Sequence, residues 1–266
     1  MTTTGAQWNP DQYARFRAER SQPFYDLAAM VEARPGMRVV DLGCGDGALT
    51  AWLHEHLEAG ETIGVDNSDT MMAATTKQAK PGLRFQQHDI AAWNPTERYD
   101  LIFANASLQW VPDHEALIPR LYSFLAPGGQ LAVQVPMQDE HVSHRTAEAV
   151  AEEEPYASAL GGYTRGFDRV LRPVRYSEML WEIGCPEQRV RLNIYPHEMP
   201  GYEAVIEWVK GTYLTAYETR LGPELFASYF AEYEKRIEAA LGGQRPYLYT
   251  YPRILIWAKM ASSPRR

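Results

Sequence analysis

A glycine-rich turn flanked by carboxylates is the strongest chemical signal in this sequence. The run Val39-Val-Asp-Leu-Gly43-Cys-Gly45-Asp-Gly47 stands where a short apolar stretch gives way to a helical pattern. Glycines at such a turn let the chain bend tightly and bring its backbone against a ligand. The spacing G-x-G-x-G differs from the G-x-G-x-x-G of dinucleotide-binding proteins. Because Asp41 and Asp46 would repel a pyrophosphate, the turn favours a cationic ligand.

Two more carboxylates follow the next two apolar stretches. Asp66 closes the stretch 62–65, 19 residues after Gly47, and Asp89 follows the stretch 83–87. A carboxylate at the first place can accept hydrogen bonds from both hydroxyls of a ribose, and one at the second can reach an adenine amino group. S-adenosylmethionine carries a sulfonium, an ammonium and a ribose but no phosphate. We therefore predict S-adenosylmethionine as the cofactor, S-adenosylhomocysteine as its product, and no metal ion.

Short strands alternate with helical patterns through the first half of the chain. This alternation is typical of βαβ units and a parallel sheet. Two later strands suggest that the sheet also contains an antiparallel strand. Residues 137–175 hold few branched apolar side chains and are expected to form a lid or substrate-side insert. The predicted strands are 38–42, 62–65, 83–87, 99–104, 130–135, 188–195 and 253–259, and the predicted helices are 23–33, 49–57, 69–79, 114–125, 176–184, 202–220 and 224–241.

Composition narrows the classes of partner. The chain has 266 residues and a net charge of −8, with 34 acidic against 26 basic residues. This balance argues against a nucleic-acid partner, which needs a basic face, and against an electrostatic membrane anchor. No apolar run approaches the roughly 18 residues of a membrane helix. Cys44 and Cys185 match no metal spacing, so we expect a reduced, cytoplasmic protein. Oligomeric state is left open, with a monomer as the working expectation.

The motifs resemble those of class I S-adenosylmethionine-dependent methyltransferases. Asp41-Leu-Gly-Cys-Gly45, Asp66, His88-Asp89 and Leu125-Ala-Pro-Gly-Gly129 occur in the family's order over residues 36–135. The resemblance implies an α/β, Rossmann-like fold with a seven-stranded, mostly parallel sheet, flanking helices and a helical lid or insert. A Rossmann-type dehydrogenase is the alternative, but the glycine spacing argues against it. The cofactor-binding residues we expect are Asp41, Gly43, Cys44, Gly45, Asp66, Asn67, Asp89, Ile90 and Asn105.

Two absent motifs point to a small acceptor. The N-P-P-Y motif of many amino-group methylases is missing, because Ala106 and Ser107 follow Asn105, and no Pro-Cys nucleophile for pyrimidines is present. Beyond the core, further segments resemble the trans-aconitate 2-methyltransferase family over nearly the whole chain. That resemblance implies methyl transfer to a carboxylate of trans-aconitate, a polycarboxylate, to give a monomethyl ester. These segments are Trp8-Asn-Pro10, Tyr13, Phe16, Glu19-Arg20, Pro23, Phe103–Trp110, Pro112-Asp113-His114, His197-Glu-Met-Pro200, Ile206–Val209 and Tyr251-Pro-Arg253.

The chemistry of such a transfer fits these residues. A carboxylate is ionised at neutral pH and needs no general base, so we expect catalysis by positioning and no catalytic residue. Arginine suits a polycarboxylate because its planar fork binds a carboxylate through two hydrogen bonds. The insert and its borders add Arg145, Arg165, Arg169, Arg172 and Arg175, with His141 and His144. The substrate-binding residues we favour are Arg20, Trp110, Arg253, Tyr251 and Tyr13.

The whole chain, residues 1–266, is expected to form a single methyltransferase domain. Its expected parts are N-terminal helices over the cofactor (1–35), a cofactor-binding core (36–135), an insert (136–187) and C-terminal strands and helices (188–266). Two alternatives stay open: a methyltransferase for another small carboxylate or hydroxyl acceptor, and a non-catalytic S-adenosylmethionine-binding protein.

Overall fold

A computed structural model describes residues 21–164 and 170–262. The chain divides into two compact units. The core unit comprises Met1–Val135, Arg172–Arg191 and Ile254–Arg266, and the second unit comprises Pro136–Leu171 and Leu192–Arg253. Residues 172–191, expected partly in the insert, thus belong to the core unit. Whether the two units act as one domain stays a prediction.

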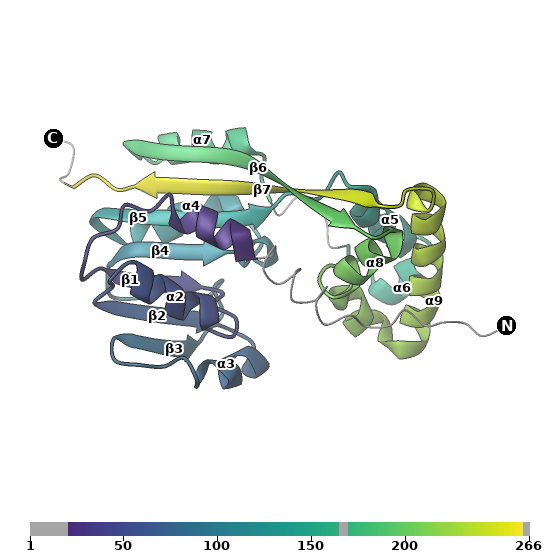
Figure 1. The fold of residues 1–266 in the computed structure, drawn as a ribbon, viewed down its shortest axis with the longest axis horizontal. Coiled ribbons are helices and arrows are strands. Elements are labelled where there is room, and N and C mark those ends of the chain that lie inside the picture. The colour runs from purple at the N-terminus through teal and green to yellow at the C-terminus, as the bar shows by residue number, and fades with distance from the viewer. Residues whose placement is uncertain (1–20, 165–169, 263–266) are drawn as a thin grey trace. The chain divides into compact units, whose positions relative to one another are not determined.

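A seven-stranded sheet of order β3-β2-β1-β4-β5-β7-β6 confirms the expected fold class. The pairs β1–β2, β1–β4, β2–β3 and β4–β5 are parallel, and β7 runs opposite to β4 (Figure 1). The carboxyl ends of the five parallel strands therefore share one edge of the sheet. The strands are β1 (Arg38–Leu42), β2 (Glu61–Asp66), β3 (Leu83–Gln87), β4 (Tyr99–Asn105), β5 (Leu125–Pro136), β6 (Glu187–Met199) and β7 (Tyr247–Lys259).

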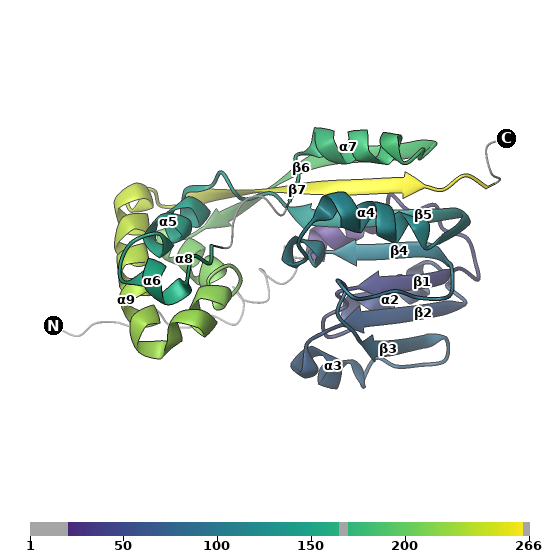
Figure 2. The ribbon, with the colours of Figure 1, turned by 180° about the vertical axis from the view of Figure 1, so that it is seen from behind.

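Helices cover both faces of the core unit's sheet. Residues 21–28 and α2 (Ala48–His56) lie on one face (Figure 1), and α4 (His114–Ser123) and α7 (Pro173–Glu182) lie on the other (Figure 2). A short α3 (Asp69–Thr75) precedes β3. The buried core under the first face joins the helix to the strands through Phe24, Leu27, Val39, Leu53, Leu57, Leu101, Phe103, Ala132, Leu255 and Trp257.

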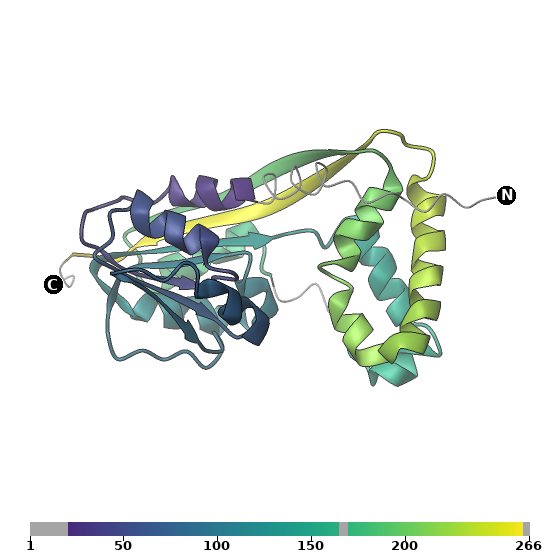
Figure 3. The same ribbon diagram turned by 60° about the horizontal axis from the view of Figure 1, so that its bottom comes forward.

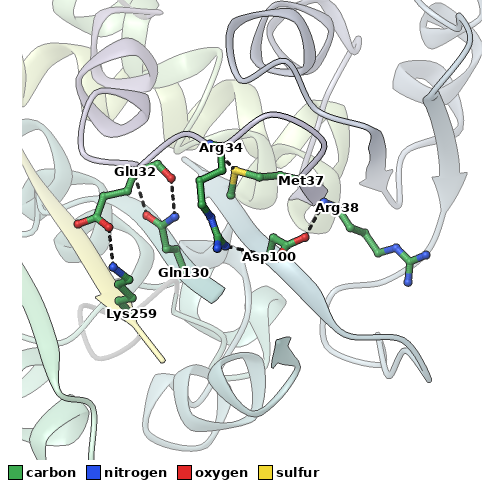
Figure 4. A network of polar contacts seen from close by, with 7 residues as sticks. All are labelled: Glu32, Arg34, Met37, Arg38, Asp100, Gln130 and Lys259. Carbon is green, nitrogen blue, oxygen red and sulfur yellow. Dashed lines mark hydrogen bonds and ion pairs between the residues drawn. The ribbon is translucent and has the colours of Figure 1, made fainter. Parts of the chain in front are cut away.

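Side-chain hydrogen bonds connect the strands to the preceding segment at the amino edge of the sheet (Figure 4). The buried Gln130 side chain accepts from the Glu32 backbone N–H at 2.8 Å and donates to the Glu32 carbonyl at 2.9 Å. Its Oε1 also accepts from Trp257 Nε1 at 2.8 Å. Asp100 accepts from the Arg38 backbone N–H at 2.9 Å. These contacts fix the segment that leads into β1, so the strand enters the sheet in one register.

The second unit is mainly helical (Figure 3). Its long helix α9 contacts each of the other three helices. Inside, the buried Glu148 carboxylate accepts from the Tyr217 hydroxyl at 2.6 Å and from the Tyr213 hydroxyl. Within the described ranges, no helix is both long and apolar enough to cross a membrane. The helices are α5 (Val142–Ala151), α6 (Tyr156–Leu160), α8 (Tyr202–Lys210) and α9 (Thr215–Leu241).

Some predicted boundaries were wrong. The helix expected at 202–220 ends at Lys210, and α9 begins at Thr215. The break expected between 220 and 224 is present inside α9, because Gly222 has a non-helical backbone conformation. Gly222 has a φ of 70°, which a glycine adopts without cost. The last strand begins at Tyr247 rather than 253, because its buried tyrosines at 247, 249 and 251 alternate with exposed residues at 248 and 250 as a strand requires.

Candidate active site

The turn after β1 is held in a left-handed path by three glycines. Gly43, Gly45 and Gly47 have φ values of 84°, 56° and 77°. The backbone N–H groups of Gly43 and Cys44 both donate to the Val65 carbonyl, at 2.7 and 3.0 Å. These bonds tie the turn to the end of β2, so the glycine turn and Asp66 move together.

Asp66 is oriented by backbone donors on both sides. Its Oδ2 accepts from the Gly45 N–H and its Oδ1 accepts from the Ser68 N–H, each at 2.9 Å. The side chain remains partly exposed. Each carboxylate oxygen has more than one lone pair, so acceptor capacity remains for the hydroxyls of a ribose.

Gly43 and Gly45 serve different purposes. A Cβ built on Gly43 would lie 2.2 Å from the Cβ of Ser107, so the loop after β4 leaves no room for a side chain there. A Cβ on Gly45 would meet nothing within 4 Å. Gly43 is therefore needed for packing, whereas Gly45 faces open space into which a ligand can fit.

Asp41 lies beneath the turn rather than on its surface. It is 2% exposed, and its Oδ2 accepts from the Thr50 hydroxyl at 2.6 Å. Burial raises the pKa of Asp41 to about 7; the Thr50 hydrogen bond lowers it, and the nearby Asp66 charge adds to the rise. A cation above the turn would favour the ionised form of this carboxyl group.

Asn105 ends β4 at the same edge of the sheet. Its Oδ1 is a buried oxygen without a hydrogen-bond partner in the described structure. An unpaired buried acceptor is costly, so its presence at a strand end suits a ligand that brings a donor. Open space over Gly45, the fixed Asp66 carboxylate and this oxygen together fit S-adenosylmethionine.

The other expected cofactor residues show less distinctive geometry. Cys44 is buried, and burial raises the pKa of its thiol, with the charges of Asp41 and Asp66 adding to the rise. Asn67 and Asp89 are exposed and Ile90 is half-buried. The Asp89 Oδ1 accepts from the Ala91 N–H at 2.8 Å, which fixes the turn after β3. Their roles stay predictions.

In the second unit, Arg253 lies among aromatic rings. It is 7% exposed, and its Cζ lies 4.7 Å from the ring centroid of Tyr251 and 6.0 Å from that of Tyr195. Tyr251 in turn packs against His197 and Trp208. A guanidinium in such surroundings is weakly hydrated and interacts strongly with an anion.

The remaining candidates fall into three groups. Trp110, 46% exposed, follows β4 in the core unit. Tyr13, Arg20, Arg165 and Arg169 lie outside the described residues. Arg175 binds Glu115 through two contacts of 2.7 Å and Glu182 through a third of 2.7 Å, so its charge is already neutralised by the chain. In the described ranges, no cluster of three or more His, Cys, Asp or Glu side chains could hold a metal ion.

Sequence reasoning missed Ser107. Its hydroxyl donates to the Leu42 carbonyl at 2.5 Å, and its Cβ occupies the place where Gly43 would otherwise carry a side chain. The available signal was a small polar residue directly after the end of a buried parallel strand. The contact spans 65 residues of sequence, so spacing alone could not identify the partner.

Comparison with known proteins identifies the family of the chain. Residues 39–129, which include the glycine turn and Asp66, match a family model described as a methyltransferase domain. The trans-aconitate 2-methyltransferase of Deinococcus radiodurans is 42% identical over 256 residues, covering 94% of this chain and 97% of that protein.

Solved structures share the fold. A putative methyltransferase from Bacillus halodurans superposes with a TM-score of 0.61 at 14% identity, covering 89% of this chain and 98% of that one. Phosphoethanolamine N-methyltransferase 2 of Haemonchus contortus, solved with S-adenosylmethionine, gives 0.53 at 14% identity, covering 91% and 52%. The structures show the fold. The 42% identity to the Deinococcus protein over nearly the full length shows that the chain belongs to the trans-aconitate 2-methyltransferase family of S-adenosylmethionine-dependent methyltransferases.

Proposed function

We propose that this protein transfers a methyl group from S-adenosylmethionine to a carboxylate of trans-aconitate, giving the monomethyl ester and S-adenosylhomocysteine. The observation that supports a carboxylate acceptor is the buried Arg253 guanidinium, which packs against the rings of Tyr251 and Tyr195. The planar guanidinium binds a carboxylate through two hydrogen bonds, and the aromatic rings around it limit its hydration, so this side chain suits a polycarboxylate. A relative from Deinococcus radiodurans, 42% identical over 256 residues, is a trans-aconitate 2-methyltransferase.

The cofactor supplies a methyl group on a sulfonium, which is electrophilic and needs no metal. In this proposal Asp66 accepts from the ribose hydroxyls, Gly45 leaves room for the ligand, and Asn105 offers its side-chain oxygen to a donor. Asp89, Asn67 and Ile90 border the adenine. Arg253 holds the acceptor carboxylate, and Tyr251 keeps water from the guanidinium.

No residue need remove a proton in this reaction. The acceptor carboxyl groups ionise near pH 4, so the attacking oxygen is already negative at neutral pH. The protein contributes by holding that oxygen in line with the methyl–sulfur bond. The buried, free cysteines are consistent with our proposal of a cytoplasmic protein.

Labelled methyl transfer across trans-aconitate, cis-aconitate, citrate and isocitrate tests the proposal. We expect one ester product, formed fastest from trans-aconitate. Transfer only to another acid, or to none, would contradict the acceptor assignment.

Arg253→Gln tests the proposed anion site. Losing one charge-assisted contact should lower kcat/KM for trans-aconitate by about tenfold to a hundredfold. Arg245→Gln is the matched control, because Arg245 is an exposed arginine of the same unit that pairs with Glu203. Equal kinetics for the two variants would place the acceptor elsewhere.

A further inference from the structure

The loop between β4 and α4 is held by several polar contacts within the core unit. This loop, Ala106–Asp113, begins and ends on residues with positive φ, 52° at Ala106 and 57° at Asp113. The Gln109 side chain donates to the Ala106 carbonyl at 2.7 Å, and the Ser107 hydroxyl binds the end of β1. A non-glycine residue with a left-handed backbone conformation costs free energy, so the surrounding contacts must compensate for that cost.

His114, the first residue of α4, makes the longest-range of these contacts. Its Nε2 lies 2.8 Å from the Leu108 carbonyl oxygen, and its Nδ1 lies 2.5 Å from the Tyr176 hydroxyl on α7. His114 is 1% exposed and Tyr176 is fully buried. The imidazole thus connects the short turn Leu108–Trp110 to a helix that follows it by more than 60 residues.

The partners determine the tautomer. A carbonyl oxygen only accepts, so Nε2 must carry the proton. Burial lowers the pKa of His114, although the Leu108 contact and Asp113 oppose that shift, and the neutral ring then has a bare Nδ1. That nitrogen accepts from the Tyr176 hydroxyl. The Leu108 carbonyl therefore selects the tautomer, and the Tyr176 hydroxyl holds the ring in place by donating to Nδ1.

We propose that His114 and Tyr176 are positioning residues: Tyr176 fixes the imidazole so that its Nε2–H holds the Leu108 carbonyl, and with it the turn that carries Gln109 and Trp110. The relevance of the turn to the acceptor rests on the proposed function. The contacts of His114 do not depend on the proposed function, and every residue that makes them belongs to the core unit.

Nitrogen-15 NMR of the full chain, labelled at histidine, tests the tautomer directly. The His114 signal, identified by its loss in His114→Gln, should show a proton on Nε2 and none on Nδ1. A ring protonated on Nδ1, alone or with Nε2, would overturn the proposal whatever the acceptor is.

Fluorine NMR tests the positioning role. In protein labelled with 5-fluorotryptophan, the Trp110 signal is identified by its loss in Trp110→Phe. Tyr176→Phe and His114→Asn should shift or broaden it, since Asn places its amide nearer the Nδ1 position. His114→Gln should leave it closer to wild type, because its amide can reach Leu108. Tyr122→Phe is the control, as it removes a tyrosine hydroxyl that α4 directs at Lys259.

Kinetics separate positioning from simple stabilisation. In Tyr176→Phe, kcat for trans-aconitate should fall about tenfold while the dissociation constant of S-adenosylhomocysteine changes less than about twofold. A Trp110 signal and a kcat that match those of Tyr122→Phe would overturn the proposal. If the wild-type protein is inactive on trans-aconitate, the proposed function is wrong. The two NMR experiments would still test whether His114 and Tyr176 position the turn.

Discussion

The two edges of the parallel sheet in the core unit differ in how their polar groups are satisfied. At the amino edge, Gln130 bonds Glu32 and Asp100 bonds the start of β1 (Figure 4). Gln130 also accepts from the Trp257 indole. At the carboxyl edge, Gly45 faces open space and Asn105 Oδ1 is buried without a partner. The first arrangement stabilises the fold on its own, whereas the second suits the cofactor that we propose for this edge. Open α/β sheets generally bind ligands at the carboxyl ends of their strands.

Gln130→Leu should give the largest loss of stability. The substitution leaves the Trp257 indole N–H and both backbone groups of Glu32 without their partner, and each buried unpaired group costs about 1–3 kcal/mol. We expect the free energy of unfolding to fall by about 3 kcal/mol or more, measured by urea denaturation. The dissociation constant of S-adenosylhomocysteine should stay the same, and a weakened one would show that the two edges are coupled.

Asp41 should make stability depend on pH. The pKa of about 7 in the folded protein exceeds the ordinary 3.8, so the folded state binds this proton more tightly. The free energy of unfolding should therefore fall as pH rises from about 4 to about 7, by about 2 kcal/mol between pH 5 and 7 relative to Asp41→Asn. Parallel curves for the two proteins would show that the carboxyl group titrates normally.

Gly43→Ala should destabilise the protein by about 2 kcal/mol, since the new Cβ would collide with Ser107 at a positive φ. Adding Ser107→Gly removes the colliding Cβ and should restore part of the loss. Urea denaturation of the single and double variants measures this coupling. Additive effects would contradict the close approach of the two residues.

Gly45→Ala should change stability least, by about 1 kcal/mol from its left-handed backbone alone. Its main effect should be on the ligand, because the methyl group enters the open space over the turn. Titration calorimetry should show weaker binding of S-adenosylhomocysteine. An unchanged dissociation constant would mean that the cofactor does not approach Gly45.

The parallel core was predictable because its signals are local. The apolar strand 38–42, the glycine turn and Asp66 lie close in sequence, and the strand order follows from βαβ geometry. Arg253 was expected from family resemblance, but its aromatic surroundings depend on a strand that begins six residues earlier than predicted.

Long-range contacts were not predictable. The contact of Ser107 with Leu42 spans 65 residues, and that of His114 with Tyr176 spans 62. The hydrophobic periodicity of a sequence does not indicate which distant residues form such pairs. For Arg175 the sequence suggested a role that the structure does not support. A cluster of arginines in the sequence suggested an anion site, but in the folded chain Arg175 pairs with Glu115 and Glu182.

Binding of S-adenosylhomocysteine to Asp66→Ala and Asp100→Ala tests the difference between the two edges most directly. Both residues are aspartates of the same sheet that accept from backbone N–H groups, Asp66 at the carboxyl edge and Asp100 at the amino edge. Calorimetry should show at least about a tenfold weaker dissociation constant for Asp66→Ala, as loss of a hydrogen bond to a charged acceptor requires. Asp100→Ala should bind as the wild type does. Wild-type affinity in Asp66→Ala, or an equal loss in both variants, would contradict the assignment of the cofactor to the carboxyl edge.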